Sequence, residues 1–169
     1  MIPPAEQLVA DLADQFGRPD VSADVAALLA QADQAAARFD PACRACGQCC
    51  RFGQFGHVLY LTSAELVHVV GSLKSDPAYQ PAIARAAEAI EHMLTAEFCP
   101  FQQNERCTLR TIRPLGCRLF FCQAGNEIWG CQLLETFHKQ LKSICEMRCL
   151  PYGYVEWTTA VKHFLPLVR

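Results

Sequence analysis

The sequence predicts a mainly α fold: a small, irregular helical domain organised around a cysteine-ligated metal or iron-sulfur site. Three observations lead to this prediction. Apolar residues recur at helical spacing through most of the chain, two blocks of cysteines interrupt that pattern, and turn residues separate the segments. We expect one domain over residues 1–169, with an N-terminal helical layer (1–40), a cysteine-cluster core (41–122) and C-terminal helices (123–169).

The composition limits the classes of function. The chain has 169 residues, of which 51% are hydrophobic, and this suffices for a core. Its net charge of -2 offers no basic surface to attract phosphate backbones, so we expect no nucleic-acid partner. No apolar run approaches the roughly 18–20 residues that cross a bilayer, and the N-terminus lacks the pattern of an export signal. We therefore expect a cytoplasmic protein without a membrane partner.

The first forty residues predict two antiparallel helices. One spans about residues 5–16, with Gly17 and Pro19 as its stop signal, and the other spans about residues 22–39. Both carry an apolar stripe of the kind that usually packs into a core. We interpret them as a packing layer, with a docking surface for a partner helix as the alternative.

The first cysteine block places four thiols within eight residues: Cys43, Cys46, Cys49 and Cys50. Thiolates are soft, strong ligands of zinc, copper(I) and iron-sulfur clusters, and a Cys-x2-Cys pair can reach one ion from a tight turn. The spacing Cys43-x2-Cys46-x2-Cys49 is also that of the first three ligands of a bacterial ferredoxin cluster. Neighbouring side chains diverge, so we expect Cys49 and Cys50 to serve different sites or different atoms of one cluster.

The segment between the two cysteine blocks predicts turns and helices. The expected elements are a glycine-rich turn (51–56), a short strand-like run (57–61), a helix opened by a capping box at Thr62 and Glu65 and running to about Leu73, and a longer helix (81–95). His57 is the histidine nearest the first block in sequence, which makes it a candidate further ligand.

The second cysteine block is more widely spaced and consists of Cys99, Cys107, Cys117 and Cys122. Its gaps of seven, nine and four residues are typical of loops and differ from the paired spacing of a simple zinc ribbon. The arginines among these cysteines are Arg110, Arg113 and Arg118. Guanidinium groups near thiolates offset negative charge and lower thiol pKa values. The alternative is that these arginines lie at the surface, paired with Glu105 or with solvent.

The rest of the chain predicts two more helices, over about residues 131–147 and 155–164. It also carries three further cysteines: Cys131, Cys145 and Cys149. We interpret these as ordinary free cysteines, although Cys145 and Cys149 have a spacing that could bind a metal from a helix end.

Eleven cysteines leave three interpretations to compare. A disulfide scaffold suits an oxidising compartment, whereas the expected cytoplasmic location keeps thiols reduced. Scattered buried thiols do not account for the four closely spaced cysteines of the first block. Metal ligation is therefore favoured, with the eight cysteines of the two blocks as the candidate ligands.

The order of these motifs resembles a known family. The chain reads Cys-x2-Cys-Gly-x-Cys-Cys from Cys43, then Cys-Pro-Phe from Cys99, then Cys-x5-Arg-Pro-x2-Cys-Arg from Cys107. This is similar to the YkgJ-like cysteine-cluster family of zinc- or iron-chelating domains, of which flagellin lysine N-methylase is a larger relative. The resemblance covers about residues 43–122 and implies metal binding by seven cysteines: Cys43, Cys46, Cys49, Cys50, Cys99, Cys107 and Cys117.

The chain departs from this family at two places. Relatives often have Ile-Tyr after the cysteine that matches Cys107, whereas this chain has Thr108 and Leu109, so no tyrosine role carries over. Relatives also vary at Cys122. Eight ligands would suit either two four-thiolate sites or one 4Fe-4S cluster with a separate zinc.

The sequence therefore supplies metal ligands, but it contains no recognisable motif of a hydrolase or nucleotide enzyme. The favoured function is a metal-binding protein that holds an iron-sulfur cluster or zinc in a structural, storage or transfer role. The alternatives are an iron-sulfur redox enzyme or electron carrier, and a zinc-stabilised module that binds a protein partner. The ferredoxin-like spacing and the surplus of thiols favour iron slightly over zinc, and both over copper(I).

Overall fold

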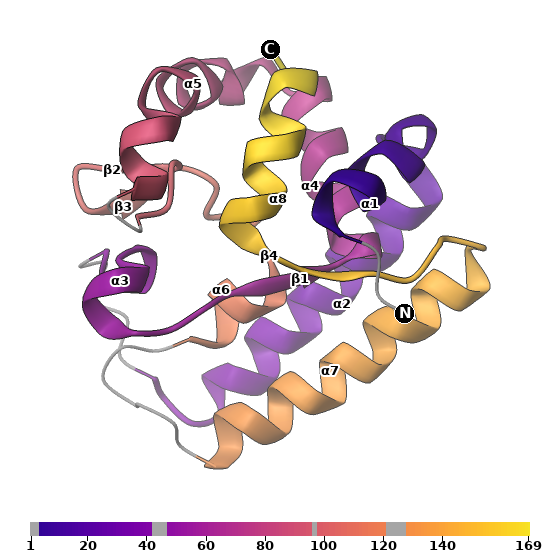
Figure 1. The fold of residues 1–169 in the computed structure, drawn as a ribbon. Coiled ribbons are helices and arrows are strands. Elements are labelled where there is room, and N and C mark those ends of the chain that lie inside the picture. The colour runs from indigo at the N-terminus through magenta and orange to yellow at the C-terminus, as the bar shows by residue number, and fades with distance from the viewer. Residues whose placement is uncertain (1–3, 42–46, 96–97, 121–127) are drawn as a thin grey trace.

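The computed structural model describes residues 4–41, 47–95, 98–120 and 128–169 (Figure 1). The described part contains eight α-helices: α1 (Ala5–Asp11), α2 (Pro19–Ala37), α3 (Phe52–Phe55), α4 (Ser63–Ser75), α5 (Gln80–Thr95), α6 (Leu115–Leu119), α7 (Ile128–Met147) and α8 (Trp157–Phe164). It also contains four short strands: β1 (Tyr60–Thr62), β2 (Gln102–Gln103), β3 (Arg106–Cys107) and β4 (Tyr154–Glu156). The prediction of a mainly helical fold is confirmed.

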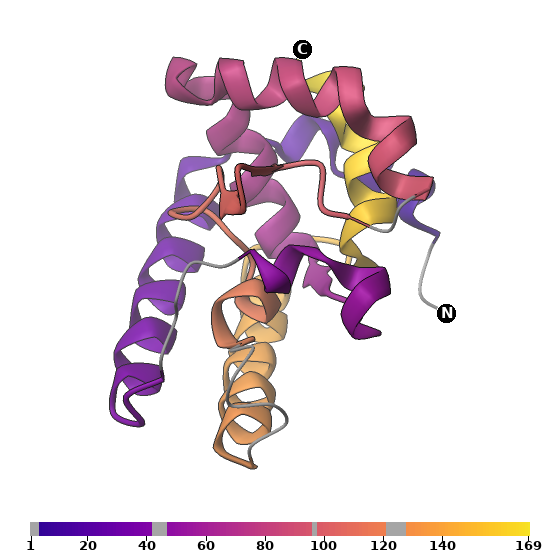
Figure 2. The same cartoon turned by 90° about the vertical axis from the view of Figure 1, so that its left-hand side faces the viewer.

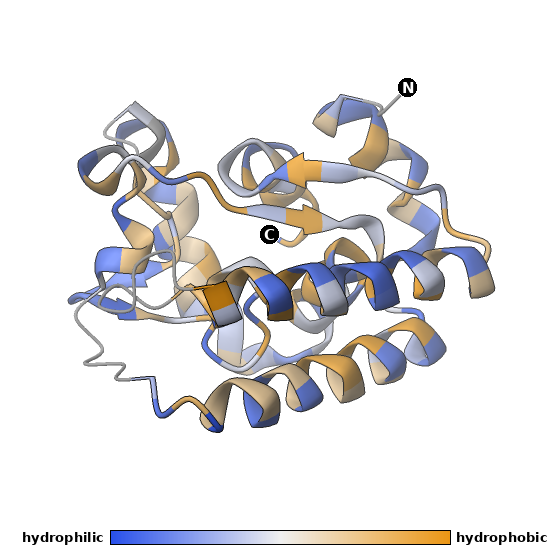
Figure 3. Ribbon diagram, turned by 90° about the horizontal axis from the view of Figure 1, so that it is seen from below, coloured by the Kyte–Doolittle hydropathy of each residue, from blue (hydrophilic) through white to orange (hydrophobic). Residues whose placement is uncertain are grey.

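Helices α2, α4 and α7 form the centre of the packing. Helix α2 contacts both α4 and α7. Helices α2 and α7 lie side by side in the views of Figure 2 and Figure 3. The buried face of α2 repeats at helical spacing and consists of Val21, Val25, Leu28, Leu29, Ala32 and Ala36. The stripe predicted for this helix is therefore a packing face, as expected.

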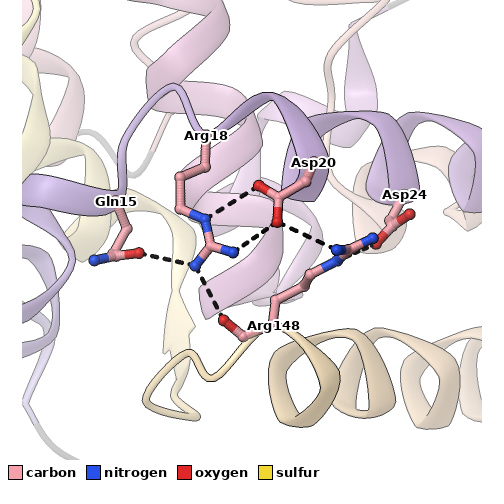
Figure 4. Close-up of polar contacts among 5 residues, drawn as sticks. All are labelled: Gln15, Arg18, Asp20, Asp24 and Arg148. Carbon is pink, nitrogen blue, oxygen red and sulfur yellow. Dashed lines mark hydrogen bonds and ion pairs between the residues drawn. The ribbon is translucent and has the colours of Figure 1, made fainter.

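Contacts at both ends of α2 show that it runs antiparallel to α7. Beyond the C-terminal end of α2, Phe39 stacks on Trp129 in the first turn of α7, with ring centroids 4.7 Å apart. At the other end, Arg148 follows α7 and lies 2.7 Å from an oxygen of Asp24 and 3.3 Å from one of Asp20 (Figure 4). Ion pairs that are half exposed to solvent contribute little free energy each, so these pairs fix the relative orientation of the helices more than they stabilise the fold.

The second helix begins three residues earlier than predicted. Pro19 was expected to act in a stop signal, but it occupies the first turn of α2, where its missing N–H costs no hydrogen bond. The preceding turn is made by Gly17 at φ +86°. This turn packs directly on α4, because a Cβ atom built on Gly71 would lie 2.6 Å from the Cα of Gly17.

Helix α4 begins as the sequence predicts. The side chain of Thr62 accepts a hydrogen bond from the Glu65 backbone N–H, and the Glu65 carboxylate accepts one from the Thr62 N–H. This is the expected capping box. The predicted glycine-rich turn over residues 51–56 is wrong in conformation, because residues 52–55 form the short helix α3, which Gly56 ends at φ +64°.

Strands β1 and β4 pair antiparallel and join the middle of the chain to its C-terminal part. Tyr60 lies opposite Glu156, and Thr62 lies opposite Tyr154. The backbone N–H of Trp157 continues the contact by donating to the Leu59 carbonyl at 2.8 Å. The pairing therefore fixes where α8 begins and which surface Trp157 faces.

The close contact between Gly71 and Gly17 predicts that Gly71→Ala destabilises the protein. The added methyl group meets backbone atoms that cannot rotate away, so we expect the free energy of unfolding to fall by about 1–3 kcal/mol. Urea denaturation of the two proteins measures this difference. Gly130→Ala is the matched control, because a Cβ at this position in α7 meets nothing within 4 Å and should stabilise the helix slightly. Equal loss of stability in both variants would contradict the packing described.

Candidate metal centre

The end of the first cysteine block is a tight turn that requires glycine. Residues 48–50 form one 3₁₀ turn after Gly47, which lies at φ +69°. The Gly47 carbonyl accepts hydrogen bonds from the Cys50 N–H at 3.0 Å and from the Gln102 amide at 2.8 Å. A Cβ on Gly47 would lie 2.6 Å from the Glu105 carbonyl oxygen. The absence of a side chain thus lets the first block lie against the loop of the second.

Backbone and side-chain contacts join the two blocks. The Cys99 N–H donates to the Cys50 carbonyl at 2.8 Å, and Arg51 forms an isolated bridge with Phe98. The Arg51 guanidinium also pairs with the Glu105 carboxylate at 2.5 Å. These contacts place Cys50 and Cys99 beside each other although they are far apart in the sequence.

Helix α6 carries Cys117 and is held by two buried charged residues. A carboxylate oxygen of Glu65 in α4 accepts the Leu115 N–H at 2.7 Å, at the first turn of α6. Arg118 pairs with Asp33 of α2 at 2.5 Å and donates to the carbonyl oxygens of Thr111 and Arg113. Glu65 and Arg118 therefore fix the loop and helix that present residues 113–117.

Five cysteine side chains from four places in the chain line one small cavity: Cys49, Cys50, Cys99, Cys107 and Cys117. The cavity has a volume of about 20 Å³, roughly that of one water molecule. Its other walls are mostly apolar and consist of Phe52, Leu59, Phe101, Leu109, Arg113, Pro114 and Trp157. The expected convergence of the two blocks is found for these five residues, whereas Cys43, Cys46 and Cys122 lie outside the described residues.

Cys49 and Cys50 both line this cavity. The 3₁₀ turn brings two neighbouring side chains to one space, so the described geometry gives no support to separate, distant sites for them. The other interpretation, that they would bind different atoms of one centre, is compatible with it.

Hydrogen bonding among the thiols gives them unequal acidity. A hydrogen bond from Cys50, helped by the charge of Arg113, lowers the pKa of Cys49 to about 6. The same kind of bond from Cys50 lowers the pKa of Cys107 to about 7. The Cys50 thiol itself contacts several sulfurs, first of all Cys107, and these hydrogen bonds raise its pKa. Burial raises the pKa of Cys117, and the neighbouring cysteines raise it further.

Arg113 and Arg118 have different positions although both belong to the cysteine motif. Arg113 lines the cavity, and its charge helps to lower the pKa values of Cys49 and Cys107 and opposes part of the rise in the pKa of Cys117. Arg118 is turned toward Asp33 and two backbone carbonyls, and burial lowers its pKa. The predicted charge-offsetting role thus suits Arg113, whereas Arg118 holds the loop in place.

His57 lies behind the first block. Its Nε2 atom lies 3.1 Å from the Cys49 carbonyl oxygen, and its ring stacks on Phe120 with centroids 4.1 Å apart. It is not among the residues that line the cavity. Its position is therefore that of a packing residue that supports the turn at Cys49.

The three C-terminal cysteines are separate from the cavity. Cys145 is buried in the core, and Cys131 and Cys149 are exposed. All eight cysteines in the described ranges are free thiols, so no disulfide scaffold is found there. The interpretation of these three residues as ordinary cysteines agrees with their positions.

The five sulfurs share a cavity without already surrounding a common point. No group of three or more His, Cys, Asp or Glu side chains is arranged to hold a metal ion within the parts of the chain that the structure describes. The donor set nevertheless fits a thiophilic metal, because it combines sulfur ligands, a nearby guanidinium and apolar walls. Binding through these residues would require their side chains to reorient around the metal.

One further residue of this site, Trp157, is not indicated by any pattern in the sequence. Trp157 begins α8, and its indole N–H donates to the Cys99 sulfur at 3.2 Å. No local motif marks this tryptophan, because only the pairing of β1 with β4 brings it to the cysteines. Trp157 therefore could not be identified from spacing.

Similarity to known proteins does not indicate a function for this chain, so the function is inferred from the geometry of the site. No family model, curated protein or solved structure matches the chain. The resemblance to the YkgJ-like family thus stays a prediction. No helix within the described ranges has the length and apolar character needed to span a membrane.

The unequal acidity of the thiols predicts selective alkylation of the metal-free protein. Since the pKa values of Cys49 and Cys107 are lowered to about 6 and about 7, both side chains are largely thiolates at pH 8 and should react with iodoacetamide first. Cys50 and Cys117, whose pKa values are raised, should remain unmodified longer. Mass spectrometry with fragmentation assigns each label, and preferential labelling of Cys117 over Cys107 would contradict the described site.

Proposed function

We propose that this protein binds a metal centre, an iron-sulfur cluster or zinc, through thiolates from both cysteine blocks, in a structural, storage or transfer role. The observation that carries the proposal is the meeting of five thiols in one cavity with mostly apolar walls. Free cysteines are often buried, but separate buried cysteines have no reason to converge. The same grouping is what the resemblance to the YkgJ-like family implies.

Charge in the cavity gives a physical reason for a bound cation. Several thiols cannot ionise together at close range without compensation. Hydrogen bonds already raise the pKa of Cys50, and burial, followed by the neighbouring cysteines, raises the pKa of Cys117. A metal ion replaces the protons of its ligands and supplies positive charge at the same place. Arg113 offsets part of the remaining negative charge.

A regulatory disulfide accounts for the grouping less well. Cys50 has three sulfur neighbours: Cys107, Cys49 and Cys99. A disulfide would use one of these neighbours and leave the other two without a function. A metal centre uses several sulfurs at once, so it accounts for the whole group.

The number of thiols favours iron slightly over zinc. A structural zinc site takes four ligands, and the cavity is lined by five cysteines before Cys43 and Cys46 are considered. A cluster distributes its ligands over several iron atoms, so it can use neighbouring cysteines such as Cys49 and Cys50. Both metals remain within the proposal.

Partial exposure favours an electron carrier as the second candidate. Cys49, Cys107 and Cys117 are half-buried, whereas Cys50 and Cys99 are buried. A cluster at this position would lie close to the surface on one side, and such proximity suits electron exchange with a partner.

Metal analysis of cysteine variants tests the proposal. Protein purified without oxygen should contain iron with acid-labile sulfide, or zinc, in a fixed ratio to the chain. Cys50→Ser should lower metal affinity by about 10–100-fold or more, since even lost outer contacts cost that much. Cys131→Ser is the matched control, because Cys131 is exposed and is not among the residues that line the cavity. Metal content that is equal in both variants, or absent from the unmodified protein, would contradict the function.

We expect removal of the Arg113 charge to shift the pH at which the protein releases its metal. Arg113→Gln should raise the pKa values of Cys49 and Cys107, because the cation that lowers them is lost. Protons then compete better with the metal, so the midpoint of release on acidification should move to higher pH. Arg85→Gln, on the exposed surface of α5, is the control and should leave the midpoint unchanged. A midpoint for Arg113→Gln that equals the control would show that this charge does not act on the centre.

A further inference from the structure

Trp157 is fixed on three sides beside the cavity. Its backbone N–H donates to the Leu59 carbonyl at 2.8 Å, and its ring lies against Phe101 and Phe164, with centroids 6.1 and 6.0 Å away. The residue is only 2% exposed. A buried indole N–H needs an acceptor, and here the acceptor is the Cys99 sulfur at 3.2 Å.

Cys99, the acceptor of this hydrogen bond, is also held in a fixed position. Its backbone N–H is bound to the Cys50 carbonyl, and its side chain is 5% exposed. A neutral thiol is a weak acceptor, whereas a thiolate is a strong one because hydrogen bonds to charged groups are roughly twice as strong. The indole N–H therefore stabilises Cys99 most when its sulfur carries negative charge.

We propose that Trp157 is a positioning residue of the metal centre, whose indole N–H hydrogen-bonds the ligating sulfur of Cys99. This inference rests on the proposed function, in which Cys99 is a ligand. The hydrogen bond orients one sulfur lone pair toward the indole and leaves the others for the metal. It also withdraws electron density from the sulfur, so the metal-sulfur bond becomes less electron-rich.

The proposal has a spectroscopic consequence that packing alone would not produce. A hydrogen bond lowers the energy of the sulfur lone pair, so more energy is needed to move an electron from sulfur to metal. Loss of the bond should shift the sulfur-to-metal charge-transfer band to longer wavelength. In an iron-sulfur form, the same loss should lower the reduction potential, because hydrogen bonds to the sulfurs raise it.

The test uses the full-length chain loaded with cobalt(II), which gives visible charge-transfer bands with thiolate ligands. Trp157→Phe keeps an aromatic ring among Phe101 and Phe164 but removes the N–H donor. We expect this variant to bind cobalt with the stoichiometry of the unmodified protein and to show the band at longer wavelength. Trp129→Phe is the control, because Trp129 stacks on Phe39 and does not line the cavity, and it should show no shift.

The outcomes separate this inference from the function on which it rests. Cobalt binding with an unshifted band in Trp157→Phe would overturn the role of Trp157 and leave the metal centre intact. No charge-transfer band in the unmodified protein would overturn both.

A second measurement applies even if Trp157→Phe fails to fold. Trp129→Phe leaves Trp157 as the only tryptophan, because the chain has two. Cobalt binding should then quench most of the fluorescence of this variant, since the remaining indole touches a ligating sulfur. Unchanged fluorescence at full cobalt occupancy would overturn the proposal.

Discussion

The close approach of several ionisable sulfurs in one mostly apolar cavity is the constraint on which the rest of the site depends. Thiolates that share one small cavity repel one another, and burial adds to the free-energy cost of ionising each thiol. The metal-free protein meets the constraint by keeping Cys50 and Cys117 protonated while Cys49 and Cys107 ionise more easily. A metal would meet it by supplying the positive charge directly, and a structural metal can contribute about 10–16 kcal/mol to folding.

The helical scaffold holds the cysteines close together by fixing the segments that carry them. Glu65 and Arg118 tie the Cys117 helix to α4 and α2, and both are buried. Gly47 allows the first block to lie against the loop of the second. The pairing of β1 with β4 brings α8, and with it Trp157, to the cavity, where the indole N–H donates to the Cys99 sulfur. The five sulfurs thus come from four separate places in the chain, so the cavity forms only when these segments have packed together.

Much of the fold follows from local patterns in the sequence. The apolar repeats of α2, α5 and α7 and the capping box of Thr62 and Glu65 are short-range signals, and the helices they predict are present within a few residues. The meeting of the two cysteine blocks was also predicted, because the chemistry of thiol groups favours it. These features depend on neighbours in sequence or on the preference of one side-chain type.

Other features depend on contacts between distant segments, and the sequence could not predict them. Strands of three residues carry too little pattern to predict that β1 pairs with β4, so the position of Trp157 was missed. Arg113 and Arg118 stand in one motif, and only the position of Asp33 on α2 shows which of them turns away from the cysteines. The common orientation of Cys49 and Cys50 likewise depends on the positive φ of Gly47.

X-ray absorption at the metal edge of the loaded protein shows whether the cysteines are the ligands, because it reports the atoms bound to the metal. If the converging cysteines hold the metal, its first shell consists of sulfur atoms, at about 2.3 Å for zinc. A first shell of nitrogen and oxygen atoms at about 2.0–2.2 Å would contradict the claim that the converging cysteines hold the metal.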